Sequence, residues 1–274
     1  MVERHEKKGE KAMKDLENII LEKKTGIAKL ILNRPDAMNA LDGKTYEELW
    51  TATEDVRTDN DVRVVVITGA GRAFCTGLDL KYGGKILGMD QTELRAIMGK
   101  IQETFMLERI EKPVIAAVNG YALGNGCDLA LACDFRIASE EARFGMTYTK
   151  LGLIPDVGGT YRLARLVGVS KAKELIFTGD MIDAREAEKI GLVDKVVAAG
   201  ELESAMMEFA KKLAKCAPIP IGIAKKAINK ALDTNLREAL EAELQGQILC
   251  FQTEDVKEGV KARIEKREPM FKGK

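Results

Sequence analysis

A glycine-rich turn at residues 119–128, Asn-Gly-Tyr-Ala-Leu-Gly-Asn-Gly-Cys-Asp, carries the clearest chemical signal in the sequence. It follows an apolar run at 113–118 that predicts a buried strand, and it precedes an apolar run at 129–132 that predicts a helix. Glycine lets a ligand approach bare backbone, and the first N–H groups of a helix lack intrahelical partners and attract negative charge. The turn is therefore suited to binding an oxyanion.

A second stretch of the same kind lies upstream, at residues 72–80, Arg-Ala-Phe-Cys-Thr-Gly-Leu-Asp-Leu. It follows a predicted strand at 62–68 and leads into helical sequence. A single glycine-rich turn often serves only to pack a helix on a sheet, and the turn at 119–128 lacks the glycine spacing of dinucleotide and phosphate loops. Two such loops, however, could each give one backbone N–H to the same oxygen.

The composition limits which groups could move protons. The chain of 274 residues holds one histidine, His5, in a charged N-terminal segment. A Ser-His-Asp triad or a histidine-rich metal site is therefore not expected, and acid/base chemistry falls to carboxylates, tyrosine or lysine. Five cysteines without a Cys-x-x-Cys pair predict neither a disulfide framework nor a zinc site. We expect no metal.

Charge and hydropathy limit the possible partners. Lys plus Arg and Asp plus Glu number 43 each, so the chain lacks the overall basic field typical of nucleic-acid binding, and we expect no nucleic-acid partner. Residues 1–14 mix charges without an apolar segment, and no later run has the length of a membrane span. We therefore expect a flexible N-terminal arm at 1–14, no membrane partner and a cytoplasmic protein.

Strands and helices alternate in the predicted elements that would position the two turns. Residues 19–24 and 27–32 predict a β-hairpin with glycine in its turn. Three glycines within 82–89 predict a mobile loop before a helix that begins near Asp90 and runs to about residue 110. The order fits stacked β-β-α units. Further helices are predicted at 41–56, 158–167, 170–178, 222–232, 236–251 and 254–267.

Four motifs, at 32–41, 74–81, 118–134 and 151–163, resemble the crotonase, or enoyl-CoA hydratase/isomerase, superfamily, and the resemblance extends from about Leu16 to the end of the chain. It implies the α/β fold class, with a crotonase-like spiral of ββα repeats over 15–200 and a helical C-terminal trimerisation domain over 201–274. It also implies an acyl-CoA substrate, no cofactor beyond the coenzyme A of that substrate, and a homotrimer or a hexamer built as a dimer of trimers.

The resemblance also implies roles for residues in both glycine-rich turns. In this family two peptide N–H groups hold the thioester oxygen of an acyl-CoA, and by motif these belong to Leu78 and Asn125. Such an oxyanion hole acidifies the α-carbon proton, because negative charge moves onto the oxygen in the enolate. The implied substrate- and coenzyme A-binding residues are Ala37, Met38, Ala40, Thr76, Gly77, Asp79, Leu80, Gly124 and, reaching into a neighbouring subunit, Lys266.

The expected acid/base residues depart from the family's hydratase pattern. Hydratases of the family use two glutamates to hold one water, and those positions are occupied here by Asp128 and Tyr148. A phenol with a reference pKa of ~10 is a poor general base at neutral pH. Asp156 precedes a predicted helix, whose dipole would favour its ionised form, and several isomerase subgroups carry aspartate there. Helix capping by either aspartate, and a pocket wall made by Tyr148, remain alternatives.

These residues favour an isomerase-type member with an aspartate base. Leu78 and Asn125 would stabilise an enolate while Asp156, with Asp128 as a second participant, moves a proton between carbons of an unsaturated acyl-CoA. One alternative is hydration of an enoyl-CoA or a cyclic dienoyl-CoA by Asp128 and Asp156. The other is a non-catalytic scaffold that binds acyl-CoA or RNA, although the balanced charge and low aromatic content do not favour RNA.

Overall fold

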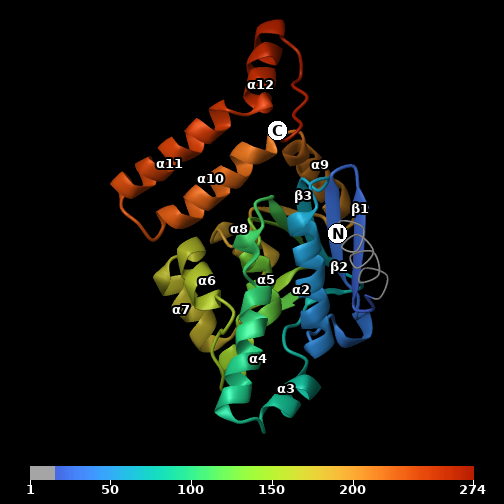
Figure 1. Ribbon diagram of the computed structural model, residues 1–274. Helices are drawn as coiled ribbons and strands as arrows, with labels where there is room; N and C mark the ends of the chain where they lie inside the picture. The colour runs from blue at the N-terminus through green and yellow to red at the C-terminus, as the bar shows by residue number, and fades with distance from the viewer. Residues whose placement is uncertain (1–15) are drawn as a thin grey trace, which may run out of the picture.

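Two β-sheets form the centre of the protein in the computed structural model, which describes residues 16–274 (Figure 1). The arm predicted at 1–14 lies outside the described residues. In spatial order, the larger sheet contains β1 (Ile19–Lys24), β2 (Ile27–Leu32), β3 (Val64–Gly69), β5 (Val114–Val118), β7 (Phe135–Ser139) and β10 (Lys195–Val197). The smaller sheet contains β4 (Ala73–Cys75), β6 (Tyr121–Leu123), β8 (Arg143–Gly145) and β9 (Met181–Asp183).

The chain passes from the larger sheet to the smaller one in three successive repeats, β3 to β4, β5 to β6 and β7 to β8. β2, β3, β5, β7 and β10 pair in parallel, as do β4, β6 and β8, whereas the β1–β2 hairpin and the β8–β9 pair are antiparallel. Helices separate the repeats. The predicted spiral of ββα units is confirmed, and the hairpin has the bounds expected from its sequence.

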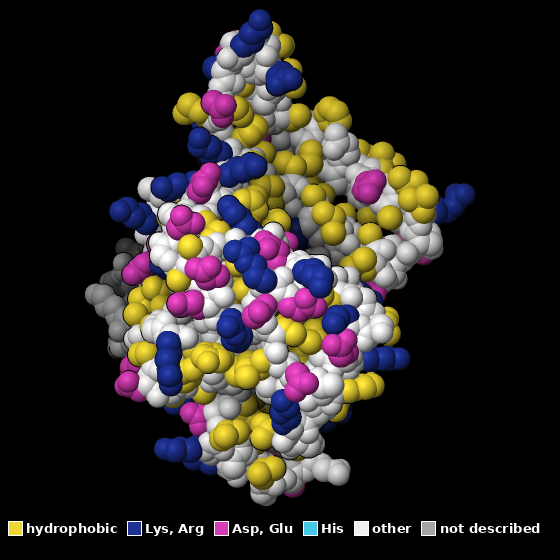
Figure 2. Space-filling model, turned by 180° about the vertical axis from the view of Figure 1, so that it is seen from behind, with side chains coloured by type: hydrophobic (Ala, Val, Ile, Leu, Met, Phe, Trp, Pro, Cys, Tyr) yellow, Lys and Arg dark blue, Asp and Glu magenta, His cyan; other side chains and the backbone are white. Residues whose placement is uncertain are grey.

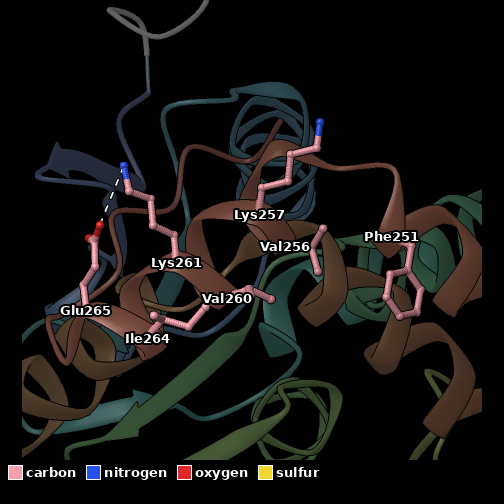
Figure 3. A pocket seen from close by; sticks show the side chains of 7 residues that line it. All are labelled: Phe251, Val256, Lys257, Val260, Lys261, Ile264 and Glu265. Carbon is pink, nitrogen blue, oxygen red and sulfur yellow. Dashed lines mark ion pairs between the residues drawn. The ribbon is translucent and has the colours of Figure 1, made fainter.

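Three C-terminal helices, α10 (Pro218–Ala231), α11 (Leu236–Phe251) and α12 (Glu254–Glu265), project from the body of the protein (Figure 1). Hydrophobic side chains gather on this projection (Figure 2), and those more than two-fifths exposed on α10 and α11 include Ile228, Leu236, Leu240, Leu244 and Ile248. An open groove of about 530 Å³ runs beside α12, where Val256, Val260 and Ile264 form its apolar side (Figure 3).

The larger sheet is covered on both faces. On one face, residues of α9 (Leu202–Ala214) pack against Val64 and Val66 of β3. On the other face, Val65 and Ile67 of the same strand join the main core, as the two-residue period of a strand requires. α9, the first helix of the predicted C-terminal domain, therefore packs on the core sheet. The predicted domain boundary at residue 201 stays a prediction.

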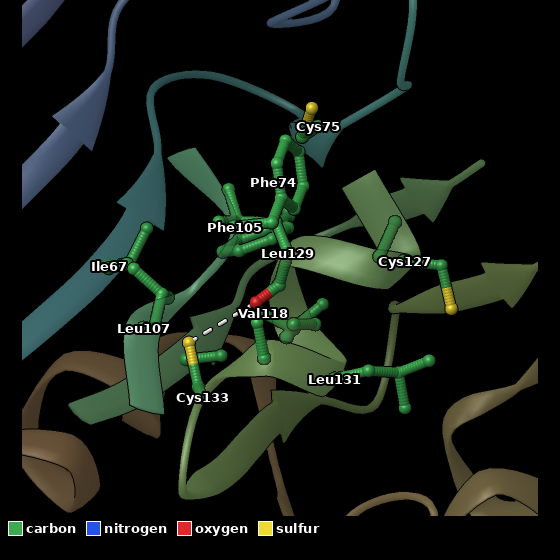
Figure 4. Packing of buried hydrophobic residues seen from close by; sticks show 14 of the residues in the cluster. Ile67, Phe74, Cys75, Phe105, Leu107, Val118, Cys127, Leu129, Leu131 and Cys133 are labelled. Atoms are coloured by element: carbon green, nitrogen blue, oxygen red, sulfur yellow. Dashed lines mark hydrogen bonds between the residues drawn. The ribbon is translucent and has the colours of Figure 1, made fainter. Parts of the chain in front are cut away.

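The main core lies between the sheets and beneath α2 (Gly43–Thr58), α4 (Gln91–Thr104) and α5 (Asn125–Ala132). Phe74 and Phe105 meet Leu129 at its centre (Figure 4), and Cys75, Cys127 and Cys133 are buried among the same residues as free thiols. Burial raises the pKa of the Cys75 thiol to about 12, which keeps it neutral. These cysteines act as small core side chains.

Two expectations for the region after β4 were wrong. Most of the predicted mobile loop at 82–89 is the helix α3 (Leu80–Ile86), because the Asp79 carboxylate caps it by accepting hydrogen bonds from the N–H groups of Lys81 and Tyr82. α4 ends at Thr104 rather than near residue 110, so the chain turns and brings both Phe105 and Leu107 into the core.

The remaining helices are short. They are η1 (Pro35–Ala37), η2 (Leu107–Arg109), η3 (Thr147–Leu151), α6 (Gly159–Val167), α7 (Val169–Thr178), α8 (Ala184–Lys189) and η4 (Ala199–Glu201). Among the described residues, no helix combines the length and the apolar character needed to cross a membrane.

Candidate active site

The smaller sheet brings the predicted site residues to one edge. Its strands β4, β6 and β8 are parallel neighbours, with Tyr121 opposite Ala73 on one side and Arg143 on the other. Because parallel strands end at the same edge, the loops that follow these three strands meet there. The first loop contains Leu78, the second leads into α5, and the third contains Tyr148. The site is therefore built by the three spiral repeats together.

The main-chain N–H groups of Leu78 and Asn125 are both free of hydrogen bonds to other residues within 16–274. Asn125 is the first residue of α5, where an N–H has no intrahelical partner. Leu41 bonds to the peptide groups on either side of Leu78, with Leu41 N to Gly77 O at 2.7 Å and Asp79 N to Leu41 O at 3.0 Å. Because peptide groups alternate along an extended segment, the Leu78 N–H points away from Leu41.

Gly77 holds the two loops against each other. Its φ of +87° lies in the left-handed region, and a β-carbon on it would lie 2.7 Å from the Leu123 carbonyl oxygen and 3.1 Å from the Asn125 amide nitrogen. Only glycine fits this contact. The two unpartnered amides therefore belong to backbone segments that touch, as one oxyanion hole requires, and their assignment to that role stays a prediction.

The segment predicted to line the coenzyme A cleft is fixed by hydrogen bonds to the first loop. The Met38 carbonyl accepts from both the main-chain N–H and the hydroxyl of Thr76, each at 3.2 Å. The side chain of Asn39 is buried and donates to the carbonyls of Ala70 and Ala73, at 2.9 and 2.7 Å. The structure thus brings the predicted residues Ala37, Met38 and Ala40 beside Thr76 and Gly77.

The other residues predicted to bind the substrate or coenzyme A are Asp79, Leu80, Gly124 and Lys266. Asp79 uses one carboxylate oxygen to cap α3 and the other to accept from Arg34 at 3.0 Å, so this carboxylate is already paired. Leu80 begins α3 and is exposed, and Gly124 precedes α5 with a φ of +51°. Lys266 ends α12, at the opposite end of the molecule from α3 (Figure 1). Its predicted contact with a neighbouring subunit remains a prediction.

Asp128 is completely enclosed. It lies in the first turn of α5, where Gly124 and not Asp128 is the N-cap residue, so the capping alternative is wrong. The Tyr148 hydroxyl donates a hydrogen bond to Oδ2, while Oδ1 has no partner among the described residues. A β-carbon on Gly159 would lie 2.1 Å from that Oδ1. Burial raises the pKa of Asp128 to about 7, and the hydrogen bond from Tyr148 opposes this rise.

Asp156 is the more accessible carboxyl. It lies in the turn before α6 with part of its surface exposed, and the side-chain amide of Asn125 donates to its Oδ1 at 3.4 Å. The alternative that Asp156 caps the helix after it was wrong. Gly158 is the N-cap of α6 and no side chain caps that helix. Burial instead raises the pKa of Asp156, while the hydrogen bond from Asn125 lowers it.

An aromatic cluster beside the carboxyls was not predicted from the sequence. The Tyr46 ring lies 6.3 Å, between centroids, from the rings of both Tyr82 and Phe105. Burial raises the pKa of Tyr46, and the nearby Cys75 and Asp156 add to the rise. In the sequence, Tyr46 has the helical spacing of a core residue. That spacing does not indicate that its side chain lies near Asp156 and Asp128.

The site thus offers two main-chain donors, two carboxyls with raised pKa values and a tyrosine hydroxyl. This combination suits proton transfer next to a carbonyl whose oxygen the amides hold. Within residues 16–274, no three or more His, Cys, Asp or Glu side chains are grouped so as to hold a metal ion.

Comparisons with known proteins identify relatives over nearly the whole chain. The family profile described as Enoyl-CoA hydratase/isomerase matches residues 22–274. The crotonyl-CoA hydratase of Syntrophomonas wolfei is 43% identical over 256 residues, which is 93% of this chain and 98% of that protein. The short-chain-enoyl-CoA hydratase of Clostridium acetobutylicum is 43% identical over 254 residues, with 92% and 97% covered.

A crystal structure of the enoyl-CoA hydratase from Bacillus anthracis superimposes with a TM-score of 0.89 at 43% identity, and the match covers 94% of this chain and 100% of that one. Similarity over nearly the whole chain, in sequence and in fold, leaves no large segment outside the match. The chain is therefore an enzyme that belongs to the enoyl-CoA hydratase/isomerase family.

Proposed function

We propose that this enzyme moves the double bond of an unsaturated acyl-CoA thioester and uses Asp156 as its acid/base group. The single observation that carries this choice is the contrast between the two carboxyls. Asp156 retains exposed surface beside Asn125, whereas Asp128 is enclosed beneath Tyr148. One accessible carboxyl suits a proton that leaves one carbon and returns to another, whereas a water held between two carboxylates needs both to face the substrate.

In the proposed reaction, the N–H groups of Leu78 and Asn125 bind the thioester oxygen. Asp156 takes a proton from the α-carbon of a 3-enoyl thioester, and the electron pair spreads over the oxygen and the existing double bond. Asp156 then returns the proton to the γ-carbon, which leaves the double bond between the α- and β-carbons. Each backbone donor typically contributes ~3 kcal/mol to stabilising such an oxyanion. No cofactor other than the coenzyme A of the substrate takes part.

Hydration is the second candidate, because the two curated relatives compared above are named as hydratases. In that reaction one carboxyl deprotonates water as it attacks the β-carbon, and a proton is added to the α-carbon. Asp128 and Asp156 could share these roles, since the charge of Asp156 helps to raise the pKa of Asp128 and so favours a pair with one proton. The position of Asp128 beneath Tyr148 counts against this candidate.

A panel of crotonyl-, 3-enoyl-, dienoyl- and phenylacetyl-type thioesters in deuterated water distinguishes these reactions. Isomerisation exchanges α or γ hydrogens and changes the ultraviolet absorption without addition of water. Hydration adds the mass of one water molecule. A scaffold binds the thioesters and does neither, and that result would exclude both reactions. Asp156→Asn and Asp128→Asn, tested on the same panel, identify the carboxyl that moves the proton.

We further propose that the C-terminal helices join copies of the chain into a trimer, or into a hexamer of two trimers. The exposed leucines and isoleucines of α10 and α11, and the groove along α12, support this assembly (Figures 2 and 3). Apolar patches of this kind are typical of surfaces that another protein covers. Sedimentation of the purified protein measures the number of copies directly.

A further inference from the structure

The turn that carries Asp156 is held by the side chains of Gln102 and Arg162. The carbonyl of Asp156 accepts a hydrogen bond from Gln102 Nε2 at 2.8 Å, and the carbonyl of Val157 accepts one from Arg162 Nη1 at 2.7 Å. Two successive peptide groups of the turn are thus fixed. Gln102 belongs to α4 and Arg162 to α6, so elements on both sides of the turn hold it.

Arg162 is itself fixed in place. Its Nε and Nη2 donate to the two carboxylate oxygens of Glu108 at 2.6 and 3.0 Å, and Nη2 also donates to the carbonyl of Phe105 at 2.9 Å. Its side chain is only 10% exposed. The planar fork of arginine is what permits several directed hydrogen bonds from one side chain. Arg162 therefore connects the turn to η2 and to the residue that follows α4.

The backbone of the turn is shaped around this guanidinium. Gly158 has a φ of +101°, and a β-carbon on it would lie 2.2 Å from Arg162 Nη1. The guanidinium thus packs directly on the glycine α-carbon. A side chain that is displaced from this position would free the turn that determines where the Asp156 carboxyl points.

We propose that Arg162 is a positioning residue that fixes the Asp156 carboxyl against the substrate, with Gln102 as its auxiliary. The inference rests on the proposed function, because it treats Asp156 as the group that moves the proton. Arg162 touches no reacting atom in this account. Misplacement of a catalytic group by about 1 Å can lower a rate by about 100-fold. The loss of Arg162 should therefore have a measurable effect on kcat.

Arg162 also provides a positive charge that acts on the enclosed carboxyl. The groups that act on Asp128 are Tyr148, Asp156 and Arg162, and Glu108 lies on the far side of Arg162. Burial raises the pKa of Asp128, and the charge of Arg162 lowers it. Removal of that charge is therefore expected to raise the pKa further, whereas replacement by lysine retains most of the effect.

The test compares Arg162→Lys, Arg162→Met and Gln102→Leu with the control Arg165→Met in the full-length enzyme. Arg165 lies on the same helix, pairs with Asp233 at 2.8 Å and stacks on Tyr161 at the surface. We expect Arg162→Lys to lower kcat about 10- to 100-fold with KM changed less than about 3-fold, because lysine retains the charge but not the fork. Gln102→Leu gives a smaller decrease, and Arg165→Met retains wild-type values.

The pH dependence of kcat tests separately whether the charge of Arg162 acts on Asp128. An inflection near pH 7 that disappears in Asp128→Asn identifies the titration of Asp128. We expect this inflection to move to higher pH in Arg162→Met and to stay in place in Arg162→Lys and Arg165→Met. If kcat of both Arg162 variants lies within about 2-fold of the Arg165→Met value, or if KM rises while kcat is unchanged, the inference is overturned.

Hydrogen exchange distinguishes a failure of this inference from a failure of the proposed function. Exchange of the amides at 153–163 should be faster in Arg162→Lys and Gln102→Leu than in Arg165→Met, whether or not a substrate is known. If the wild type converts no thioester, the proposed function fails. Hydrogen exchange alone then tests whether Arg162 and Gln102 hold the turn that carries Asp156. If exchange of these amides is unchanged in the variants, the inference is overturned even when the enzyme is active. If Arg162→Met does not fold, the other two variants carry the test.

Discussion

The edge of the smaller sheet is closely packed, whereas the C-terminal helices leave apolar side chains exposed. At the sheet edge, Asp128 is fully enclosed and Gly77 packs against the next loop, so one chain fixes the site through its own packing. On α11, by contrast, Leu240 and Leu244 are about half exposed. Under the proposed function, chemistry and assembly lie in separate parts of the chain, and substitutions should be able to disturb them one at a time.

The largest expected effect is on the chemistry alone. Asp156→Asn should lower kcat by about 10²- to 10⁴-fold, the usual contribution of a general acid or base, while the sedimentation behaviour stays that of the wild type. Steady-state kinetics with the best thioester of the panel measures the loss. Wild-type turnover by this variant would show that another group moves the proton.

Substitution at the connection between the two regions should affect stability strongly. Lys225 of α10 is buried and donates to Asp134 at 2.7 Å and to the carbonyl of Lys112 at 3.1 Å. Lys225→Met leaves the Asp134 carboxylate without its cation and should lower the free energy of unfolding by about 3 kcal/mol. Denaturant titration measures it.

The neighbouring residue supplies the control for this connection. Lys226 pairs with Glu111 at the surface, where both side chains are more than half exposed. Lys226→Met should therefore change the free energy of unfolding by less than about 1 kcal/mol. Equal losses in the two variants would mean that the buried pair does not anchor α10.

Enclosure of Asp128 should also make stability depend on pH. Its pKa is raised from 3.8 to about 7, so the folded state favours the protonated acid, and stability present below about pH 4 is lost as the pH rises toward 7. Asp128→Asn removes this dependence. As the pH rises from 4 to 8, the free energy of unfolding of the variant should increase relative to that of the wild type, by at most about 4 kcal/mol. Denaturant titration at several pH values tests this, and a constant difference would contradict it.

The smallest effect on the folded chain is expected from the exposed apolar face. Leu244→Glu should change the stability of a single chain by less than about 0.5 kcal/mol, because the side chain is about half exposed. The same change should shift the protein toward smaller assemblies in sedimentation, since it places a charge in the proposed interface. An unchanged mass would locate the interface elsewhere.

The sequence predicted well those elements whose pattern is local and long enough to read. The β1–β2 hairpin and α11 match their predicted bounds, because strand alternation, a turn glycine and helical spacing agree there. The three-residue strands of the smaller sheet, such as β6, are too short to show a period, and tertiary pairing defines them.

The site was predicted less completely than the fold, because long-range contacts set its electrostatics. The sequence places Asp156 before a helix, but it cannot show that the intervening turn directs the carboxyl toward Asn125 instead of the helix end. Arg162 and Gln102 meet the turn only in the folded chain. The resemblance to the family brought Leu78 and Asn125 together, whereas no local pattern indicated Tyr46.

The proposed oxyanion donors are peptide amides, which has an evolutionary consequence. A point mutation at position 78 or 125 exchanges a side chain but leaves an N–H in place, unless it introduces proline. The carboxyl and phenol groups around the hole have no such protection, and one nucleotide change can replace them. A lineage built on this scaffold can therefore exchange one reaction for another while it retains its capacity to stabilise an enolate.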